Sequence, residues 1–386
     1  MRPPAGGLVS AALYLTLPRL VPTRSGVCSC RMDLNALGWT PFFAEAFALC
    51  EPTGREAARV AVEHRGGYRV YSTRGELAAE LSGRFRYDAA LPGDFPAVGD
   101  WVVIETHSEE SKGVIQAVLP RRTKFSRSAA GNRAEEQIVA ANIDDVFLVT
   151  SLNRDLNPRR LERYLTLARE SGADPVIVLT KADLCEDVAA EVRRVKSVIG
   201  GVPVYVVSAV TGEGLEELAG CLRPGRTAAL LGSSGVGKST LINSWCGEER
   251  LKVQAIREHD DRGRHATSHR QLVLLPAGGL LIDTPGMREL QLWEGASGLR
   301  ETFAEVELFA ARCRFADCQH DTEPGCAVRG AVESGELDAS RLESHRKLVA
   351  EMRYLERKQV PRVQAVERRR IKSIMKSMRA HYRIRE

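Results

Sequence analysis

The sequence predicts a protein of several domains: a small β-barrel, a central α/β domain, and a helical C-terminal part with a metal site. From Arg59 to Val103, apolar residues alternate in short runs, which is typical of a barrel of antiparallel strands. After Asp144, continuous apolar runs alternate with amphipathic stretches, as in a doubly wound parallel sheet. Beyond Glu294 the chain is charged and helical in pattern, with three closely spaced cysteines. We therefore expect domains at 32–125, 126–294 and 295–386, preceded by an extension at 1–31.

The composition is that of an ordinary soluble globular protein. Of 386 residues, 44% are hydrophobic and 27% are charged. No run of about 18 apolar residues offers a membrane-spanning helix, so we expect no membrane partner. Nine cysteines, three of them clustered, favour metal binding in a reducing, cytoplasmic compartment over a disulfide framework.

Positive charge is concentrated at the C-terminal end. The formal net charge is +5, and residues 351–386 hold 12 Lys and Arg against 4 Asp and Glu. Such a segment is either a solvated helix face or a contact for a phosphate-bearing polymer.

The first 31 residues differ from the rest of the chain. They contain four arginines and no acidic residue around an apolar stretch, Leu8 to Leu17, as a targeting leader does. No Ala-x-Ala-like cleavage site precedes Met32, where globular patterning begins. We favour an upstream extension of the reading frame without fixed structure, with a leader as the alternative.

Turn residues separate the short strands expected in the barrel. Arg65-Gly66-Gly67 lies between two apolar runs and predicts a hairpin. Gly99-Asp100 precedes a further strand, Trp101 to Glu105, and an oligonucleotide-binding (OB) fold suits this pattern. Four aromatic residues could stack on bases or, as we favour, pack within the barrel: Tyr68, Tyr71, Phe85 and Tyr87.

The parallel sheet is expected from five continuous apolar runs. Such runs are buried strands when amphipathic stretches of helical length separate them. One of these stretches begins at Pro158 and presents Leu161, Tyr164, Leu165 and Ala168 on one face. The strands are expected at Val146–Val149, Val176–Leu179, Val202–Val207, Ala228–Leu231 and Leu280–Ile282.

A complete phosphate-binding loop follows the fourth of these runs and precedes a helical stretch, which is the context that this motif needs. Its glycines let backbone N–H groups approach phosphates at a helix N-terminus. Lys238 would reach the β- and γ-phosphates, and the Ser239 hydroxyl would bind Mg²⁺. By itself the loop does not distinguish ATP from GTP. The loop residues are Gly232, Ser233, Ser234, Gly235, Val236, Gly237, Lys238, Ser239 and Thr240.

A second motif, Asp283-Thr284-Pro285-Gly286, follows a predicted strand at the sheet edge where ligands bind in open α/β sheets. Asp283 can hold Mg²⁺ through water, and the Gly286 N–H can sense the terminal phosphate.

The base would be chosen by a third motif, Thr180-Lys181-Ala182-Asp183, which also follows a predicted strand. The Asp183 carboxylate can accept from the N1–H and amine of guanine, a pairing that adenine cannot make. Lys181 would lie along the base plane, and Ser208-Ala209 would donate a backbone N–H to the guanine carbonyl. Alone, this motif could be a helix start with Asp183 near a cap. Together with the other motifs it predicts GTP binding.

The base motif precedes the phosphate loop, so the motif order is circularly permuted. In the order and in the residues of its motifs, the chain resembles the ribosome small-subunit-dependent GTPase A family of bacterial GTPases, from Met32 to the C-terminus. The segments that carry the resemblance are Glu136–Asn142, Gly263–Arg270 and Leu281–Leu290. The resemblance implies a GTP hydrolase that binds the small (30S) ribosomal subunit and its rRNA late in maturation. The subunit would stimulate hydrolysis of GTP to GDP and phosphate, and we expect the protein to be a monomer.

Two departures from the family pattern affect the nucleotide site. Thr180 stands where the family often has Asn, which would weaken a contact that fixes the base-binding loop. Ala266 and Ser268 stand where the family has Thr, which leaves Thr267 as the expected switch residue that binds Mg²⁺.

The residue that orients the attacking water is not given by the motifs. Met287 follows Gly286 and cannot orient a water. His265 resembles the histidine of the family's switch loop and could position the water; ordering the loop or contacting RNA is the alternative. The candidate catalytic residues are therefore His265, Thr267 and Lys238.

Cys313, Cys318, His320 and Cys326 supply three thiolates and one imidazole, a closed tetrahedral set for one structural Zn²⁺. Pro324-Gly325 supplies a turn that brings the last ligand round. Reduced cysteines that merely cluster are the alternative. The resembled family carries the same spacing.

Residues 341–357 predict a helix with Leu342, His345, Leu348 and Met352 on one side, followed by a basic end suited to rRNA phosphates. Because Asp283 leads within a few residues into the C-terminal domain expected at 295–386, movement at Gly286 could couple nucleotide state to the C-terminal surface. Two other functions stay open: an ATPase with a zinc finger, and a non-enzymatic RNA-binding assembly factor with a structural nucleotide.

Overall fold

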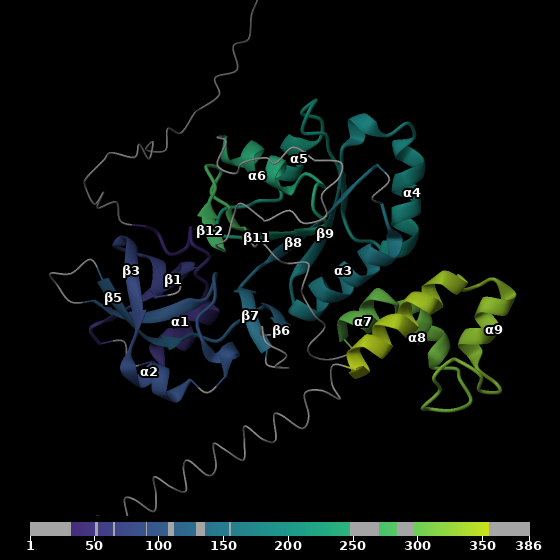
Figure 1. Cartoon of the computed structure of the whole chain (residues 1–386), viewed down its shortest axis with the longest axis horizontal. Helices are drawn as coiled ribbons and strands as arrows, with labels where there is room; N and C mark the ends of the chain where they lie inside the picture. Colours follow the sequence, from purple (N-terminus) through teal and green to yellow (C-terminus); the bar gives the residue numbers. More distant parts are fainter. Residues whose placement is uncertain are drawn as a thin grey trace, which may run out of the picture.

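The computed structural model contains a barrel, an α/β sheet and a group of C-terminal helices, in that order along the chain (Figure 1). In that view the barrel and the C-terminal helices lie on opposite sides. The segments predicted at 1–31 and after residue 354 lie outside the described part of the chain. Within the described part, no helix is both long enough and apolar enough to span a membrane. The structure describes residues 32–50, 53–64, 66–89, 91–106, 112–128, 136–153, 156–247, 270–283 and 297–354.

Five strands close the N-terminal barrel. They pair in the order β1-β2-β3-β5-β4, and β4 returns to β1, where Trp101 pairs with Arg59. The predicted hairpin is present, since His64 pairs with Gly67. The prediction of a wholly antiparallel barrel is wrong at one pair, because β3 and β5 run parallel. Parallel neighbours need a crossover, which helix α2 and strand β4 provide here. The strands are β1 (Arg55–His64), β2 (Gly67–Ser72), β3 (Gly75–Leu81), β4 (Trp101–Thr106) and β5 (Lys112–Val118).

Most of the four aromatic residues that are expected to pack within the barrel do contact other side chains. Tyr68 and Tyr71 contact the buried core, and the rings of Phe85 and Phe95 lie 6.3 Å apart between centroids. Tyr87, on helix α2 (Gly83–Asp88), is 84% exposed. Packing is therefore confirmed for three of the four positions and wrong for Tyr87.

The central sheet has the predicted parallel, doubly wound form. Its strands lie in the order β10-β9-β8-β11-β13-β12, and only β12 runs antiparallel to its neighbour β13 among these described strands. Each predicted apolar run contains a strand, although Val202 and Pro203 precede β10. The strands are β8 (Asp145–Ser151), β9 (Asp174–Thr180), β10 (Val204–Val206), β11 (Thr227–Gly232), β12 (Gln271–Leu274) and β13 (Leu280–Asp283).

Helices cover both faces of this sheet, because alternate residues of each strand point to opposite sides. Leu148 of β8 belongs to the core formed with α3 and α4, whereas its neighbours Phe147 and Val149 belong to the core formed with α5 and α6. The predicted apolar face of α3 is buried, and the Asn157 side chain caps this helix by accepting from Arg160 N. The helices are α3 (Pro158–Ser171), α4 (Val188–Ile199), α5 (Leu215–Ala219) and α6 (Lys238–Cys246).

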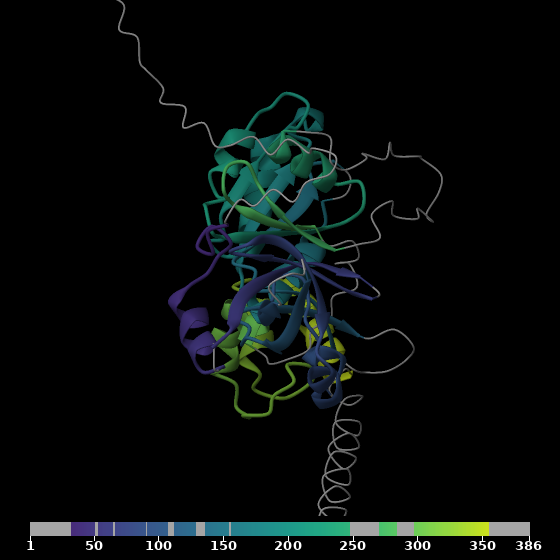
Figure 2. The ribbon, with the colours of Figure 1, turned by 90° about the vertical axis from the view of Figure 1, so that its left-hand side faces the viewer.

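Barrel and sheet are joined without a break in backbone pairing. Val62 of β1 pairs with Gln271 of β12, so the barrel continues the central sheet, and Figure 2 shows the two stacked along one axis. A separate hairpin of β6 (Lys124–Ser128) and β7 (Glu136–Ala141) links the two parts along the chain.

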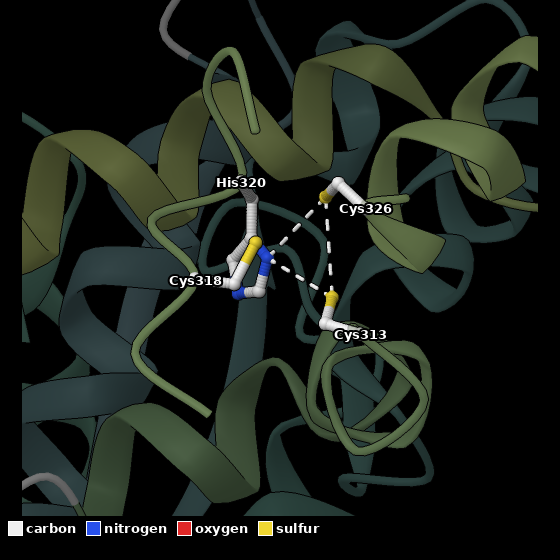
Figure 3. A group of neighbouring side chains, drawn as sticks. All are labelled: Cys313, Cys318, His320 and Cys326. Atoms are coloured by element: carbon white, nitrogen blue, oxygen red, sulfur yellow. Dashed lines mark hydrogen bonds between the residues drawn. The ribbon is translucent and has the colours of Figure 1, made fainter. Parts of the chain in front are cut away.

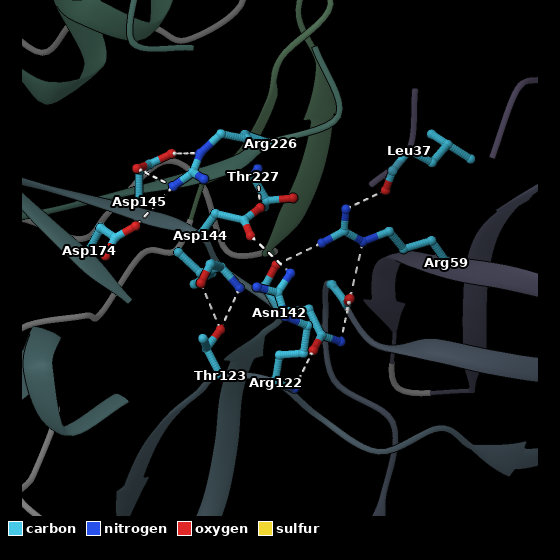
Figure 4. A network of polar contacts seen from close by, with 12 residues as sticks. Leu37, Arg59, Arg122, Thr123, Asn142, Asp144, Asp145, Asp174, Arg226 and Thr227 are labelled. Atoms are coloured by element: carbon cyan, nitrogen blue, oxygen red, sulfur yellow. Dashed lines mark hydrogen bonds and ion pairs between the residues drawn. The ribbon is translucent and has the colours of Figure 1, made fainter. Parts of the chain in front are cut away.

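Arg59 is fully buried and stabilises this junction between barrel and sheet (Figure 4). Its guanidinium donates to the backbone oxygens of Leu37, Gly99 and Asn142, which belong to three different segments. Burial lowers the Arg59 pKa to about 10, while nearby aspartates oppose the shift, so the group stays charged at neutral pH. A buried charge is tolerated where hydrogen bonds satisfy it, as these three do.

The C-terminal helices pack on α3. Gly298 of α7 approaches α3 so closely that a Cβ there would lie 2.6 Å from Thr166 O. A helical stretch at 339–354 confirms the predicted helix, since its apolar side is buried at Leu342, His345, Leu348 and Met352. The other described helices here are α7 (Ser297–Thr302), α8 (Ala304–Ala310) and α9 (Ala327–Ser334).

Candidate nucleotide-binding site and metal centre

The phosphate loop joins the end of β11 to the start of α6. Gly232 approaches β8 so closely that a Cβ would lie 2.2 Å from Val149 O. Gly235 and Gly237 have φ values of +76° and +101°, which L side chains rarely adopt. Because α6 begins at Lys238, the N–H groups of its first turn, including those of Ser239 and Thr240, point toward this loop rather than to an acceptor within the helix. The backbone is that of an anion-binding site.

Lys238 reaches across the loop that precedes it. Its Nζ donates to Gly232 O at 2.8 Å and to Ser233 O at 2.6 Å. An ammonium held at this place is available to phosphate oxygens, which would replace the two carbonyls as acceptors.

Thr180 connects the base motif with the phosphate loop. It ends β9 and is 4% exposed. Its Oγ1 donates to Val236 O at 2.6 Å and lies 3.3 Å from Thr150 O. The hydroxyl thus makes a direct bond between two of the predicted nucleotide-binding loops.

Asp183 is held by the side chain of Ser208. Asp183 lies in the short helix η2 (Ala182–Leu184), whose N-cap Lys181 has a φ of +58°. Ser208 Oγ donates to Asp183 Oδ1 at 2.5 Å and accepts from the N–H groups of Val210 and Thr211. The bond fixes the direction of the Asp183 carboxylate.

The sequence predicts a role for the backbone of Ser208 but none for its side chain. The available signal was a serine directly after a strand at the edge that carries the other motifs. A hydroxyl at such a place is within reach of the neighbouring strand end.

The Mg²⁺-binding candidates are described only in part. Asp283 ends β13, which runs parallel beside β11, so its backbone reaches the edge that carries the phosphate loop. Ser239 lies in the first turn of α6 at the same edge. The candidates His265, Thr267 and Gly286 lie outside the described residues.

The structure brings the four predicted metal ligands together (Figure 3). One donor atom from each of Cys313, Cys318, His320 and Cys326 lies within 4.8 Å of the others. His320 Nδ1 is 3.6 Å from the sulfurs of Cys313 and Cys326, which are 3.9 Å apart. His320 has a φ of +60°, and Gly325 one of +74°, so two left-handed residues shape the loop around the donors.

These distances fit a tetrahedral zinc ion. With Zn–S bonds of about 2.3 Å, two sulfur ligands lie about 3.8 Å apart. Three thiolates and one imidazole are the soft donors that zinc takes in closed structural sites, whereas Mg²⁺ and Ca²⁺ take oxygen. All seven cysteines in the described part of the chain are free thiols, so no disulfide competes for these ligands there.

Comparisons with known proteins agree with this geometry. A family model described as RsgA GTPase matches residues 118–293. "Small ribosomal subunit biogenesis GTPase RsgA" of Opitutus terrae is 47% identical over 92% of this chain and 99% of its own length. "Small ribosomal subunit biogenesis GTPase RsgA 2" of Lactiplantibacillus plantarum is 49% identical over 84% of this chain and 91% of its own.

Solved structures show the same architecture. YjeQ from Thermotoga maritima is 32% identical with a TM-score of 0.59, covering 77% of this chain and 98% of its own. YloQ, described as a circularly permuted GTPase, is 24% identical with a TM-score of 0.56, covering 78% of this chain and 95% of its own, and indicates the fold alone. With relatives so similar over nearly their full lengths, this chain belongs to the RsgA GTPase family.

Proposed function

We propose that this protein binds and hydrolyses GTP and that it acts in the late maturation of the small ribosomal subunit. One observation carries the nucleotide part: the ends of β9, β11 and β13 meet at one sheet edge, and each bears one of the expected motifs. Ligands bind at this edge in open α/β sheets.

Guanine would be recognised by Asp183, which accepts from the N1–H and the amine of the base. Ser208 supports this role, because its hydroxyl holds one carboxylate oxygen at 2.5 Å. Lys181 would lie along the base, and the Ala209 N–H would donate to the guanine carbonyl. A site built on such bonds rejects a base that lacks the matching donors.

Phosphates and Mg²⁺ would be bound by the phosphate loop, with Lys238 on the β- and γ-phosphates. Ser239, Asp283 and Thr267 would hold Mg²⁺, and the Gly286 N–H would sense the terminal phosphate. When bound, Mg²⁺ supplies charge neutralisation as the phosphoryl group transfers. His265 would position the attacking water, since Met287 cannot.

The metal of the C-terminal cluster would be one structural Zn²⁺. Its four donors leave no open position, so its role would be to hold residues 313–326 in shape. The zinc-bound segment and the basic end after residue 354 would contact rRNA.

The ribosomal part rests on the names of relatives up to 49% identical, which are small ribosomal subunit biogenesis GTPases. The protein would work as a monomer in the cytoplasm and bind the subunit in its GTP form. The subunit would stimulate hydrolysis, and release would follow.

The test is GTP turnover by the purified full-length protein with and without small ribosomal subunits. We expect stimulation by small subunits, none by large subunits, and loss of turnover in Lys238→Ala. Turnover that ignores small subunits would contradict the proposal and favour an assembly factor with a structural nucleotide. Equal use of ATP would favour an ATPase of another kind.

A further inference from the structure

Thr180, the first residue of the base motif, lies against the phosphate loop. The residue is almost fully buried, and its Oγ1 lies within hydrogen-bond distance of two backbone oxygens, Val236 O at 2.6 Å and Thr150 O at 3.3 Å. A Cβ placed at Gly237 would lie 3.8 Å from the same hydroxyl, an ordinary contact. Thr180 therefore packs against the turn that precedes Lys238 and bonds to it at Val236.

The proton count at this position decides what Thr180 can recognise. A threonine hydroxyl has one proton, and both neighbouring oxygens can only accept it. The proton is committed to Val236 O, the nearer of the two. The N7 and O6 atoms of guanine are acceptors as well, so they need a donor. Thr180 has none left to offer, whereas an asparagine there would carry two N–H donors.

We infer that Thr180 is a positioning residue, which ties the base motif to the phosphate loop and donates to no atom of the base. The inference rests on the proposed binding of GTP. Guanine is selected through its N1–H and amine, which face Asp183. The substrate class is therefore nucleoside triphosphates with these two donors, whether or not the purine carries N7.

The first test compares GTP with 7-deaza-GTP, in which a C–H group replaces N7. The wild-type protein binds the two with affinities within about twofold of each other, because no hydrogen bond to N7 is lost. Thr180→Asn binds GTP about 3- to 10-fold more tightly than 7-deaza-GTP, the effect of one added neutral hydrogen bond. The inference is overturned if the wild-type protein discriminates by such a factor, or if Thr180→Asn does not.

The second test addresses the bond to Val236. Thr180→Val keeps the shape and removes the proton, so affinities for GTP and 7-deaza-GTP fall together by about 3- to 10-fold. Thr180→Ser keeps the hydroxyl and restores binding of both. If the Val and Ser variants both bind GTP as tightly as the wild type does, the hydrogen bond to Val236 does not support nucleotide binding, and the inference is wrong. Circular dichroism of each variant confirms that it is folded before binding is measured.

Failure of the proposed function gives a different result. In that case the wild-type protein binds neither guanine nucleotide, or binds ATP as well as GTP. If only this inference fails, the wild-type protein still binds GTP in preference to ATP, but it then binds GTP more tightly than 7-deaza-GTP.

Discussion

Arg341 and Glu162 form a buried ion pair that joins the C-terminal helices to the central domain. Arg341 Nη1 lies 2.7 Å from Glu162 Oε1, and the two side chains are 9% and 3% exposed. The same guanidinium donates to Glu305 Oε1 and Thr302 O and lies 4.4 Å from the centroid of the Phe303 ring. Glu162 belongs to α3, which bears none of the nucleotide motifs. The C-terminal part is thus anchored on α3. The expected movement at Gly286 would therefore act on a region that this ion pair fixes to the central domain.

Removing one partner of this pair should destabilise the protein strongly. Arg341→Met leaves the Glu162 carboxylate buried without its cation, which costs about 3–5 kcal/mol. The double variant Arg341→Met, Glu162→Met removes both charges and should recover part of this loss. Urea unfolding gives the free energies, and limited proteolysis should show earlier cleavage within 297–354. A double variant no more stable than Arg341→Met would contradict the account.

A matched control is available in the same interface. Arg159 and Glu343 join the same two parts with an N–O distance of 2.6 Å, but their side chains are 48% and 51% exposed. Solvent screens such a pair, so Arg159→Met should leave the urea midpoint unchanged. If Arg159→Met costs as much as Arg341→Met, burial is not the reason for the effect.

The sequence predicts what local patterns determine. Apolar runs located the parallel strands, and helical spacing located the buried side of 341–354, because both follow from periodicity within one element. Ligand spacing located the cluster of Cys313, Cys318, His320 and Cys326 for the same reason. The buried roles of Arg59 and Arg341 cannot be predicted in this way, because they depend on partners distant in the chain, such as Asn142 and Glu162.

Metal removal should first unfold residues 313–326, which carry the proposed zinc ligands. Without a metal the four ligand side chains lose the bonds that hold them together, and most other residues of 313–326 are exposed. Hydrogen exchange of a zinc-loaded sample, measured before and after chelation, should show loss of protection at 313–326 and in α9 while α3 is unchanged. Folded protein that purifies without about one equivalent of zinc would show the assignment to be wrong.

Arg59→Met should loosen the junction between barrel and sheet. The substitution removes the Arg59 donor from the Leu37 and Asn142 carbonyls, each worth about 1–3 kcal/mol, whereas Gly99 O keeps a bond from Asn142 Nδ2. Arg69→Met is the control, because Arg69 pairs with Glu76 at the surface of the same barrel. Urea unfolding should separate the two variants clearly. Equal midpoints would mean that solvent or a rearranged side chain satisfies the carbonyls.

Asp183→Asn should change the base that the protein prefers. The amide offers N–H donors where guanine also offers donors, so GTP affinity should fall about a hundredfold or more, the loss of two bonds to a charged group. Xanthine carries a carbonyl in place of the guanine amine, so XTP should bind the variant better than GTP. Ser208→Ala is the matched control, because it removes the hydroxyl that holds the carboxylate but leaves the carboxylate itself unchanged. The affinity for GTP should fall by about 3- to 10-fold, and the affinity for XTP should not rise. Competition between labelled GTP and XTP measures both effects. An Asp183→Asn protein that still prefers GTP would place guanine recognition elsewhere in the chain.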